Sequence, residues 1–390
     1  MTLLLGLILA PFALLTLCFA IEVVAGLRPL HCIEAHDADR PRAIIVVPAH
    51  DEEPIISASL AALKRAVGDR ADILVIADNC SDSTAKLARG LSLEVIERSD
   101  ADRRGKGFAL DFARLHLRER RPDVIVVMDA DCESDERSIE MLVACCATTG
   151  KPCQAAYLQS AVPDGSPTLQ LSTFAFFIKN LVRQRGLQRL AGRAQLVGTG
   201  MAFPGPLFDA AALATGNIVE DLQLGLEFAD AGHAPLFIEQ AIVWSSPAGS
   251  IDTLDQRRRW EGGYLRSAAH WAPRILGRSL RRFDLRELWA AVSLLIPPLA
   301  LLVLLDVGGM ALAGTAWWLG WASSWPFLML AGSLLAAGIA LFAAWDQGGS
   351  RFVSLGTLAR VPLYVLWKIP LYLGLARRGA PKEWLRTRRS

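Results

Sequence analysis

The chain has 390 residues, of which 41 are basic and 39 acidic, and its net charge is +2. So small a positive excess does not indicate nucleic acid as the main partner. Hydrophobic residues make up 52% and charged residues 21%, which excludes a largely disordered chain and is shifted toward membrane proteins. The seven cysteines form no CxxC pair or zinc-type cluster, so neither a disulfide framework nor a structural zinc is predicted, and a reducing compartment is favoured.

The first hydrophobic segment runs from Leu3 to Leu27, is interrupted only by Pro11 and Glu22, and is long enough to cross a bilayer. It lacks the basic start of a signal peptide, and the first basic residue, Arg28, follows it. This charge order favours an N-terminus outside the membrane and a cytoplasmic domain next in the chain. Residues 1–39 are therefore predicted to form a transmembrane helix and a linker.

Residues 40–286 show short β-branched runs that alternate with amphipathic stretches, a pattern typical of βαβ units and a buried parallel sheet. The predicted class is α/β. Ligands in such sheets bind at the carboxyl ends of the strands, which makes the residues after each strand the first candidates for a site. The predicted strands are Ala43–Val47, Ile73–Ala77, Leu93–Ile96 and Val124–Met128.

Polar clusters follow three of these strands directly. Asp129 and Asp131 form the most informative cluster, because residues two apart in extended backbone point the same way and can offer two oxygen ligands to one divalent cation. Alternatively, an aspartate here caps the helix that is predicted to begin near Ser134. The three clusters are Pro48–Glu53, Asp78–Asp82 and Asp129–Asp131.

Two further motifs suggest chemistry, each with a simpler alternative. In Arg104–Gly107 two glycines flank Lys106 at the start of a helical pattern, which lets backbone and ammonium approach a phosphate; a plain glycine turn with a solvated basic face is the alternative. The adjacent carboxylates of Glu220 and Asp221 can raise one pKa and create a general base. An acidic helix N-terminus explains the same pair without function.

Two basic, aromatic segments follow a different pattern. In Gln256–Trp260 the guanidinium of Arg259 suits diphosphate oxygens and the indole of Trp260 offers an aromatic platform, although a basic helix resting on lipid explains them equally well. A helix from Leu169 to Leu190 carries phenylalanines beside basic residues and is predicted to seat the domain on the bilayer. These residues are Phe174, Phe176, Phe177, Lys179, Arg183 and Arg185.

Two more membrane spans are predicted at Leu288–Leu305 and Phe327–Trp345. Asp306 and a tryptophan-rich loop without Lys or Arg lie between them, so the hairpin, residues 287–350, should project away from the cytoplasm.

A fourth hydrophobic stretch, Phe352–Ala376, contains Arg360 and Lys368. Charges inside a span are costly, so we expect this stretch to lie on the membrane and to lead into a basic cytoplasmic tail, within residues 351–390. A fourth span with its charges facing protein is the alternative.

Taken together and in this order, the motifs resemble those of a membrane-integrated family 2 glycosyltransferase, of the exopolysaccharide, chitin-oligosaccharide, hyaluronan and cellulose synthase-like type. The resemblance covers residues 40–262. It implies a GT-A fold, which is a Rossmann-like mixed sheet, together with an inverting transfer and Mg²⁺ or Mn²⁺ as cofactor. The motifs are Pro48–Glu53, Asp78–Asn79, Arg104–Gly107, Asp129–Asp131, Gly198–Gly200, Glu220–Asp221 and Gln256–Trp260.

The resemblance also implies roles for individual residues on the donor side. Pro48, Glu52 and Asp78 would bracket the base and ribose of the nucleotide sugar. Lys106 would lie near them or near the diphosphate.

For the reaction centre, the resemblance implies that Asp129 and Asp131 hold the nucleotide sugar and its metal. Asp221, beside Glu220, would take the proton of the acceptor hydroxyl. The predicted acceptor and diphosphate residues are Gly200, Gln256, Arg259 and Trp260.

By the same resemblance the donor is expected to be a UDP-sugar. Three spans are fewer than polymer-exporting synthases use, which favours transfer to a membrane-held acceptor, a polyprenyl-diphosphate-linked oligosaccharide in exopolysaccharide biosynthesis. The expected location is the bacterial inner membrane, with the catalytic domain in the cytoplasm and other polysaccharide-assembly proteins as candidate partners. Two alternatives remain open: a ceramide- or hopanoid-type glycolipid glycosyltransferase, and a non-catalytic component of a polysaccharide export complex.

Overall fold

The computed structural model describes residues 1–31, 41–247 and 253–379. They fall into two compact units. The sheet unit contains Pro29–Ser160 and Arg193–Tyr264, and the helical unit contains Met1–Arg28, Ala161–Gly192 and Leu265–Ala380. The predicted 40–286 domain is thus divided, because residues 161–192 and 265–286 belong with the hydrophobic helices.

The sheet unit contains one eight-stranded mixed sheet with the order β3-β2-β1-β4-β7-β6-β8-β5. The four predicted strands are confirmed and form a parallel group. They are β1 (Ala43–Ala49), β2 (Ala71–Asp78), β3 (Glu94–Arg98) and β4 (Val124–Val127). The remainder is mixed in direction and consists of β5 (Cys132–Ser134), β6 (Cys153–Gln159), β7 (Met201–Pro204) and β8 (Leu236–Ser245).

The continuous apolar runs of the central strands are explained by helices on both faces of the sheet. Along β1, Ile45 and Val47 face one hydrophobic cluster while Ile44 and Val46 face the other, as the two-residue period of a strand requires. Residues of α2 (Ile56–Val67), α3 (Thr84–Gly90) and α5 (Glu136–Thr149) contribute to the first cluster. The second cluster draws on α4 (Lys106–Leu117), α8 (Gly205–Ala210) and α9 (Glu220–Asp230).

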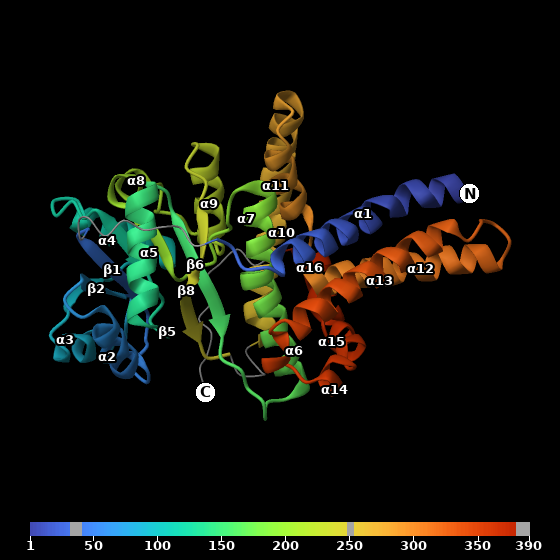
Figure 1. The fold of residues 1–390 in the computed structure, drawn as a ribbon. Helices are drawn as coiled ribbons and strands as arrows, with labels where there is room; N and C mark the ends of the chain where they lie inside the picture. Colours follow the sequence, from blue (N-terminus) through green and yellow to red (C-terminus); the bar gives the residue numbers. More distant parts are fainter. Residues whose placement is uncertain (32–40, 248–252, 380–390) are drawn as a thin grey trace. The chain divides into compact units, whose positions relative to one another are not determined.

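The helical unit contains three helices that are long and apolar enough to cross a membrane: α1 (Thr2–Gly26), α12 (Leu299–Trp318) and α13 (Trp325–Asp346). Figure 1 shows α1 beside the α12–α13 hairpin, and Leu9 and Ala13 of α1 form a buried cluster with Ala313 and Leu330. Among the described residues, the number of helices that are long and apolar enough to span is therefore the number expected.

The predicted position of the second span was wrong. Its first part belongs to α11 (Leu285–Leu295), and α12 begins only after Pro297 and Pro298, because two successive prolines cannot continue a helix. Asp306, expected in the loop, lies inside α12, where it is buried and accepts a hydrogen bond of 2.6 Å from Thr16.

The predicted helix over Leu169–Leu190 is present as α6 (Pro167–Phe177), a π-helical turn (Ile178–Val182) and α7 (Arg183–Ala191). Two of its predicted aromatic and basic side chains, however, contact protein. The rings of Phe177 and Phe352 are tilted with centroids 5.1 Å apart, and Arg183 forms a 2.7 Å ion pair with the buried Glu22 of α1. Phe177 and Arg183 are thus not available to lipid in the way we expected, whereas Lys179 is exposed.

The stretch Phe352–Ala376 does not form one long helix. It is divided into α14 (Leu355–Leu358), α15 (Val361–Trp367) and α16 (Ile369–Arg378), with a proline near the start of each of the last two. None of these helices is long enough to cross a membrane. The predicted location of this stretch on the membrane surface stays a prediction.

Candidate active site

The strand register brings the carboxyl ends of β1, β2 and β4 to one edge of the sheet. Pro48 lies opposite Ile76, two residues before Asp78, and Val46 lies opposite Val127, two residues before Asp129. The loop Gly198–Gly200 joins the same edge, because β7 begins at Met201 opposite Val127.

Asp129 and Asp131 lie together at this edge and do not cap the following helix. The cap of α5 is Asp135, whose side chain accepts a 2.7 Å hydrogen bond from the Ser138 backbone. Asp129, Asp131 and Cys132 can each offer one ligand atom, and these three atoms lie within 4.8 Å of one another.

The chemistry of this group fits a hard divalent cation. Burial, together with the charges of Asp129 and Asp131, raises the pKa of Cys132 well above its usual value, which keeps the thiol protonated. Mg²⁺ and Mn²⁺ prefer oxygen ligands, so the two carboxylates are the groups suited to hold the ion.

Lys106 connects this edge to the loop before β7. It is the first residue of α4, and its ammonium donates to the Asp129 carboxylate and to the carbonyl oxygen of Gly198. The side chain is only 17% exposed, so the alternative of a solvated basic face is wrong for this residue. Burial acts to lower the pKa of Lys106, but the negative charges of Asp129, Glu220 and Asp221 outweigh it and raise the pKa. Lys106 is therefore a charged ammonium.

Glycine is required on each side of Lys106 for a different structural reason. Gly105 has φ of 122°, a conformation that other residues rarely adopt. A Cβ on Gly107 would lie 2.6 Å from the carbonyl oxygen of Thr215 and 2.7 Å from that of Leu213. The motif thus allows the chain before α9 to pass directly against the start of α4.

Glu220 and Asp221 form the first turn of α9. A Cβ on Gly198 would lie 3.3 Å from Oδ2 of Asp221 and 4.0 Å from Nζ of Lys106, so the carboxylate and the ammonium meet at the same loop. Burial, and next the charge of Asp221, raise the pKa of Glu220 to about 8. At neutral pH Glu220 is therefore protonated, and Asp221 is the member of the pair suited to accept a proton.

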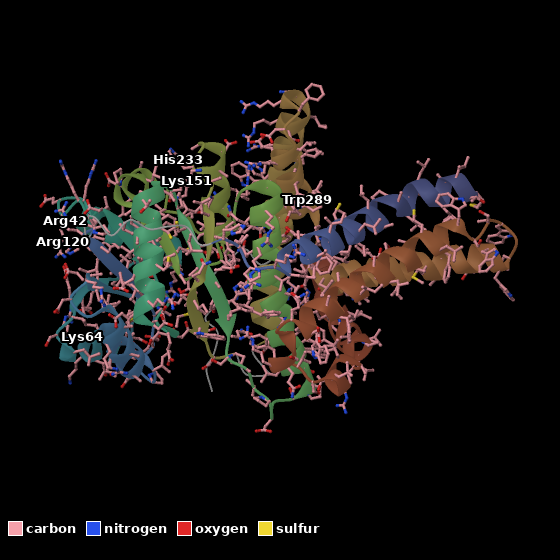
Figure 2. The ribbon with its side chains drawn as sticks, in the orientation of Figure 1. Arg42, Lys64, Arg120, Lys151, His233 and Trp289 are labelled. Atoms are coloured by element: carbon pink, nitrogen blue, oxygen red, sulfur yellow. The ribbon has the colours of Figure 1, made fainter. Side chains whose placement is uncertain are left out.

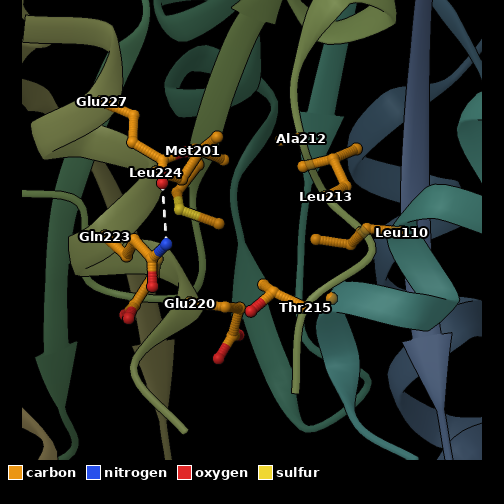
Figure 3. A pocket seen from close by; sticks show the side chains of 11 residues that line it. Leu110, Met201, Ala212, Leu213, Thr215, Glu220, Gln223, Leu224 and Glu227 are labelled. Carbon is orange, nitrogen blue, oxygen red and sulfur yellow. Dashed lines mark hydrogen bonds between the residues drawn. The ribbon is translucent and has the colours of Figure 1, made fainter. Parts of the chain in front are cut away.

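A small pocket lies between α4 and α9 behind this carboxylate pair. Figure 3 shows Glu220 near Thr215, while Gln223 donates a 2.7 Å hydrogen bond to Glu227 deeper in the lining. Leu110 and Leu224 supply apolar walls. This surrounding explains why the charged form of Glu220 is disfavoured.

The helix α10 (Thr253–Arg282) begins in the sheet unit and reaches the chain just before α9. A Cβ on Gly263 would lie 2.7 Å from Cγ1 of Val219, the residue that precedes Glu220. Trp260 is 40% exposed and Arg259 is partly buried. The side chain of Gln256 lies outside the described residues, so its predicted contact remains a prediction.

On the nucleotide side, Asp78 is already engaged within the protein. It forms a 2.6 Å ion pair with Arg98 at the end of β3 and accepts a 3.0 Å hydrogen bond from the side chain of Asn79. The predicted residue Glu52 lies nearby in the chain after β1, where its backbone N–H donates to the hydroxyl of Thr84 at 2.8 Å. Arg98 was not predicted; the sequence signal for it is a charged residue ending an apolar strand.

Two buried polar residues position the Gly198–Gly200 loop: Gln154, which the sequence analysis missed, and Thr199, which lies within the predicted motif. Gln154 donates to the carbonyl oxygen of Thr199 at 2.9 Å and accepts from the backbone of Val197 at 3.0 Å. The hydroxyl of Thr199 accepts from the backbone of Asp129 at 3.0 Å. An amide inside the apolar strand β6 was the available signal for Gln154.

Backbone conformation and close packing both explain why residue 200 is a glycine. Its φ is 63°, and a Cβ there would lie 2.8 Å from Val243 and 3.0 Å from Ala155. Its predicted contact with the acceptor or diphosphate remains a prediction.

The chain is similar to known proteins. Over 243 residues the chain is 27% identical to the probable glycosyltransferase YdaM of Bacillus subtilis (strain 168), covering 57% of this chain and 55% of that protein. The chain therefore spans about half the length of this curated relative.

Similarity to solved structures concerns the fold. The mannosyltransferase PcManGT from Pyrobaculum calidifontis, solved with GDP-Man and Mn²⁺, has a TM-score of 0.57 at 14% identity, covering 95% of this chain and 97% of that one. Glucosyl-3-phosphoglycerate synthase from Mycobacterium tuberculosis has a TM-score of 0.42 at 20% identity, covering 58% and 78% of the two chains.

The sequence model of the family described as glycosyltransferase like family 2 matches residues 41–263, more than half of the chain. This range includes the mixed sheet and every candidate site residue described above. The chain belongs to glycosyltransferase family 2, with a GT-A type sheet unit.

Proposed function

We propose that this protein transfers a sugar from a nucleotide sugar to an acceptor hydroxyl, with inversion at the anomeric carbon and with a divalent cation as cofactor. One observation carries the proposal: Lys106 contacts both Asp129 and the Gly198 loop, against which the Asp221 carboxylate lies. A candidate cation site and a candidate base are thereby held at one edge of the sheet.

On the donor side, Asp129 and Asp131 would hold Mg²⁺ or Mn²⁺. The cation would offset negative charge on the leaving diphosphate. Arg259 is the proposed guanidinium on the same diphosphate, because its planar fork suits two phosphate oxygens. Pro48, Glu52 and the region of Asp78 are proposed to surround the base and ribose, with a UDP-sugar as the expected donor.

On the acceptor side, Asp221 would remove the proton of the attacking hydroxyl. Glu220, which is protonated at neutral pH, leaves the negative charge of the pair on Asp221. A single displacement with inversion needs one such base and no enzyme nucleophile. Trp260 offers an exposed aromatic face on which an acceptor sugar can stack.

The helical unit supports a membrane-held acceptor. Three of its helices are long and apolar enough to cross a membrane. We propose a polyprenyl-diphosphate-linked oligosaccharide of exopolysaccharide biosynthesis as the acceptor, at the bacterial inner membrane, with the sheet unit in the cytoplasm.

The test is nucleotide release and product formation by the purified full chain in detergent with Mn²⁺ or Mg²⁺. Donors are a panel of UDP- and GDP-sugars, and acceptors are polyprenyl-diphosphate oligosaccharides and simple lipids. Wild-type protein is compared with Asp221→Asn and Asp131→Ala, and with Asp230→Asn, an exposed acid at the other end of α9, as control.

We expect one donor to react and both site variants to lose about a hundred- to ten-thousandfold in rate, with the control unchanged. Labelled sugar released from the product by mild acid indicates a lipid diphosphate, whereas an acid-stable product indicates a glycolipid. If no donor reacts with any acceptor, the transferase proposal fails and the non-catalytic alternative gains support.

A further inference from the structure

Lys106 and the candidate cation site share one carboxylate. The Lys106 ammonium donates directly to Oδ1 of Asp129. Asp129 is also the first residue of the Asp129–Asp131–Cys132 group whose possible ligand atoms lie within 4.8 Å of one another. A cation bound at this group and the Lys106 ammonium would draw on the same carboxylate oxygens.

Asp129 is one of two partners to which the ammonium donates. The other is the carbonyl oxygen of Gly198, and Oδ2 of Asp221 lies 3.3 Å from the place where a Cβ of Gly198 would stand. If Lys106 lost Asp129, the carbonyl oxygen of Gly198 would remain as its partner, which is the condition for an exchangeable contact of a mostly buried side chain.

We infer that the ammonium of Lys106 competes with the divalent cation for Asp129, so that the cation binds by displacing Lys106 from this carboxylate. This inference rests on the cation site of the proposed function. It makes Lys106 a positioning residue that sets how tightly the site binds its ion. A weakened site would retain the ion only when the diphosphate supplies further oxygen ligands.

The inference is tested by the binding of Mn²⁺ alone, followed as loss of the free-ion electron paramagnetic resonance signal, with full-length protein in detergent and no substrate. The variants are Lys106→Met, which removes the charge and keeps a similar length, and Lys64→Met as control. Lys64, labelled in Figure 2, is exposed on α2, and its ammonium donates to the carbonyl oxygen of Leu91 at 2.8 Å. We expect Lys106→Met to bind Mn²⁺ about three- to tenfold tighter than wild type and Lys64→Met to match wild type.

A double-mutant comparison separates competition from simple charge repulsion. Asp129→Asn removes the shared carboxylate, so in that background Lys106→Met should leave Mn²⁺ affinity unchanged. If the tighter binding persists there, the effect is through-space repulsion and the competition is overturned. Unchanged or weaker binding by Lys106→Met in the wild-type background also overturns it.

The same titrations distinguish failure of the inference from failure of the proposed site. Saturable Mn²⁺ binding by wild type that Asp131→Ala weakens supports the site whatever Lys106→Met does. Absence of saturable binding in wild type and in Lys106→Met overturns both the site and the inference. Lys106→Gln serves as a second variant, and a melting temperature within a few degrees of wild type shows that each variant is folded.

Discussion

Val219 and Gly263 lie so close that a Cβ on Gly263 would stand 2.7 Å from Cγ1 of Val219. Val219 precedes the Glu220–Asp221 turn, and Gly263 lies one turn beyond Arg259 and Trp260 on α10. This single contact ties the candidate base to the helix that carries the candidate acceptor residues. The missing side chain at residue 263 is what permits the approach.

Gly263→Ala should therefore impair the reaction. The added methyl group must push α10 away from Val219, at a cost of about 1–3 kcal/mol, and should lower the rate of transfer. Gly277→Ala is the matched control, because Gly277 lies in the same helix with open space around its Cα and alanine is the better helix former. Thermal unfolding and steady-state rates for both variants check this; an active, fully stable Gly263→Ala would contradict it.

Gly107→Ala should destabilise the sheet unit and disturb Lys106. The methyl group would meet the backbone carbonyl oxygens of Thr215 and Leu213 at 2.6 and 2.7 Å, and backbone cannot move aside as a flexible side chain can. We expect a loss of about 1–3 kcal/mol in the free energy of unfolding. Gly90→Ala on α3, where nothing lies within 4 Å, should be neutral by the same denaturant titration.

Loss of Arg98 should be far more costly than loss of a surface arginine. Arg98→Met would leave the buried carboxylate of Asp78 without its 2.6 Å ion pair, which costs about 3–5 kcal/mol when one partner of a buried pair is removed. Arg89→Met breaks the exposed pair with Glu97 and should cost at most about 1 kcal/mol. Chemical denaturation of both variants measures the difference. Equal effects would show that Asp78 does not depend on Arg98.

Glu220 should make the protein less stable as pH rises. Its pKa is raised from 4.5 to about 8 in the folded state, so between these values the folded protein keeps a proton that the unfolded chain has lost. Under the linkage relation, the free energy of unfolding must then fall as pH rises from about 4.5 through about 8.

The check is Glu220→Gln, which mimics the protonated acid and cannot ionise. We expect its stability to vary less with pH over this range than that of wild type, while transfer activity near neutral pH is largely kept. The measurement is the melting temperature of both proteins at several pH values. Parallel curves for the two proteins would show that Glu220 is not the group responsible.

Local pattern was sufficient for several features of this protein. The apolar runs of β1, β2, β3 and β4 predicted a parallel group of strands, because burial on both faces of a sheet leaves a continuous hydrophobic signature. The number of long apolar helices could be predicted in the same way, since length and hydropathy are properties of the segment alone. The order of the motifs indicated the family.

The second predicted span shows how prolines that are visible in the sequence can still be overlooked when helix bounds are predicted. The hydrophobicity of Leu288–Leu305 continues without interruption, but Pro297 and Pro298 end one helix and start another. Hydropathy averages over such a break, whereas backbone geometry does not.

What only the tertiary structure decided is which polar groups meet. Lys106 finds Asp129 and Gly198 across 23 and 92 residues of chain, and Asp135 rather than Asp129 or Asp131 caps α5. Such contacts depend on strand register and on the close approach of loops. Periodicity and propensity describe a residue's immediate neighbours, while charge pairing and burial act through space. Local pattern therefore indicated many of the helices and strands, and the fold determined the site.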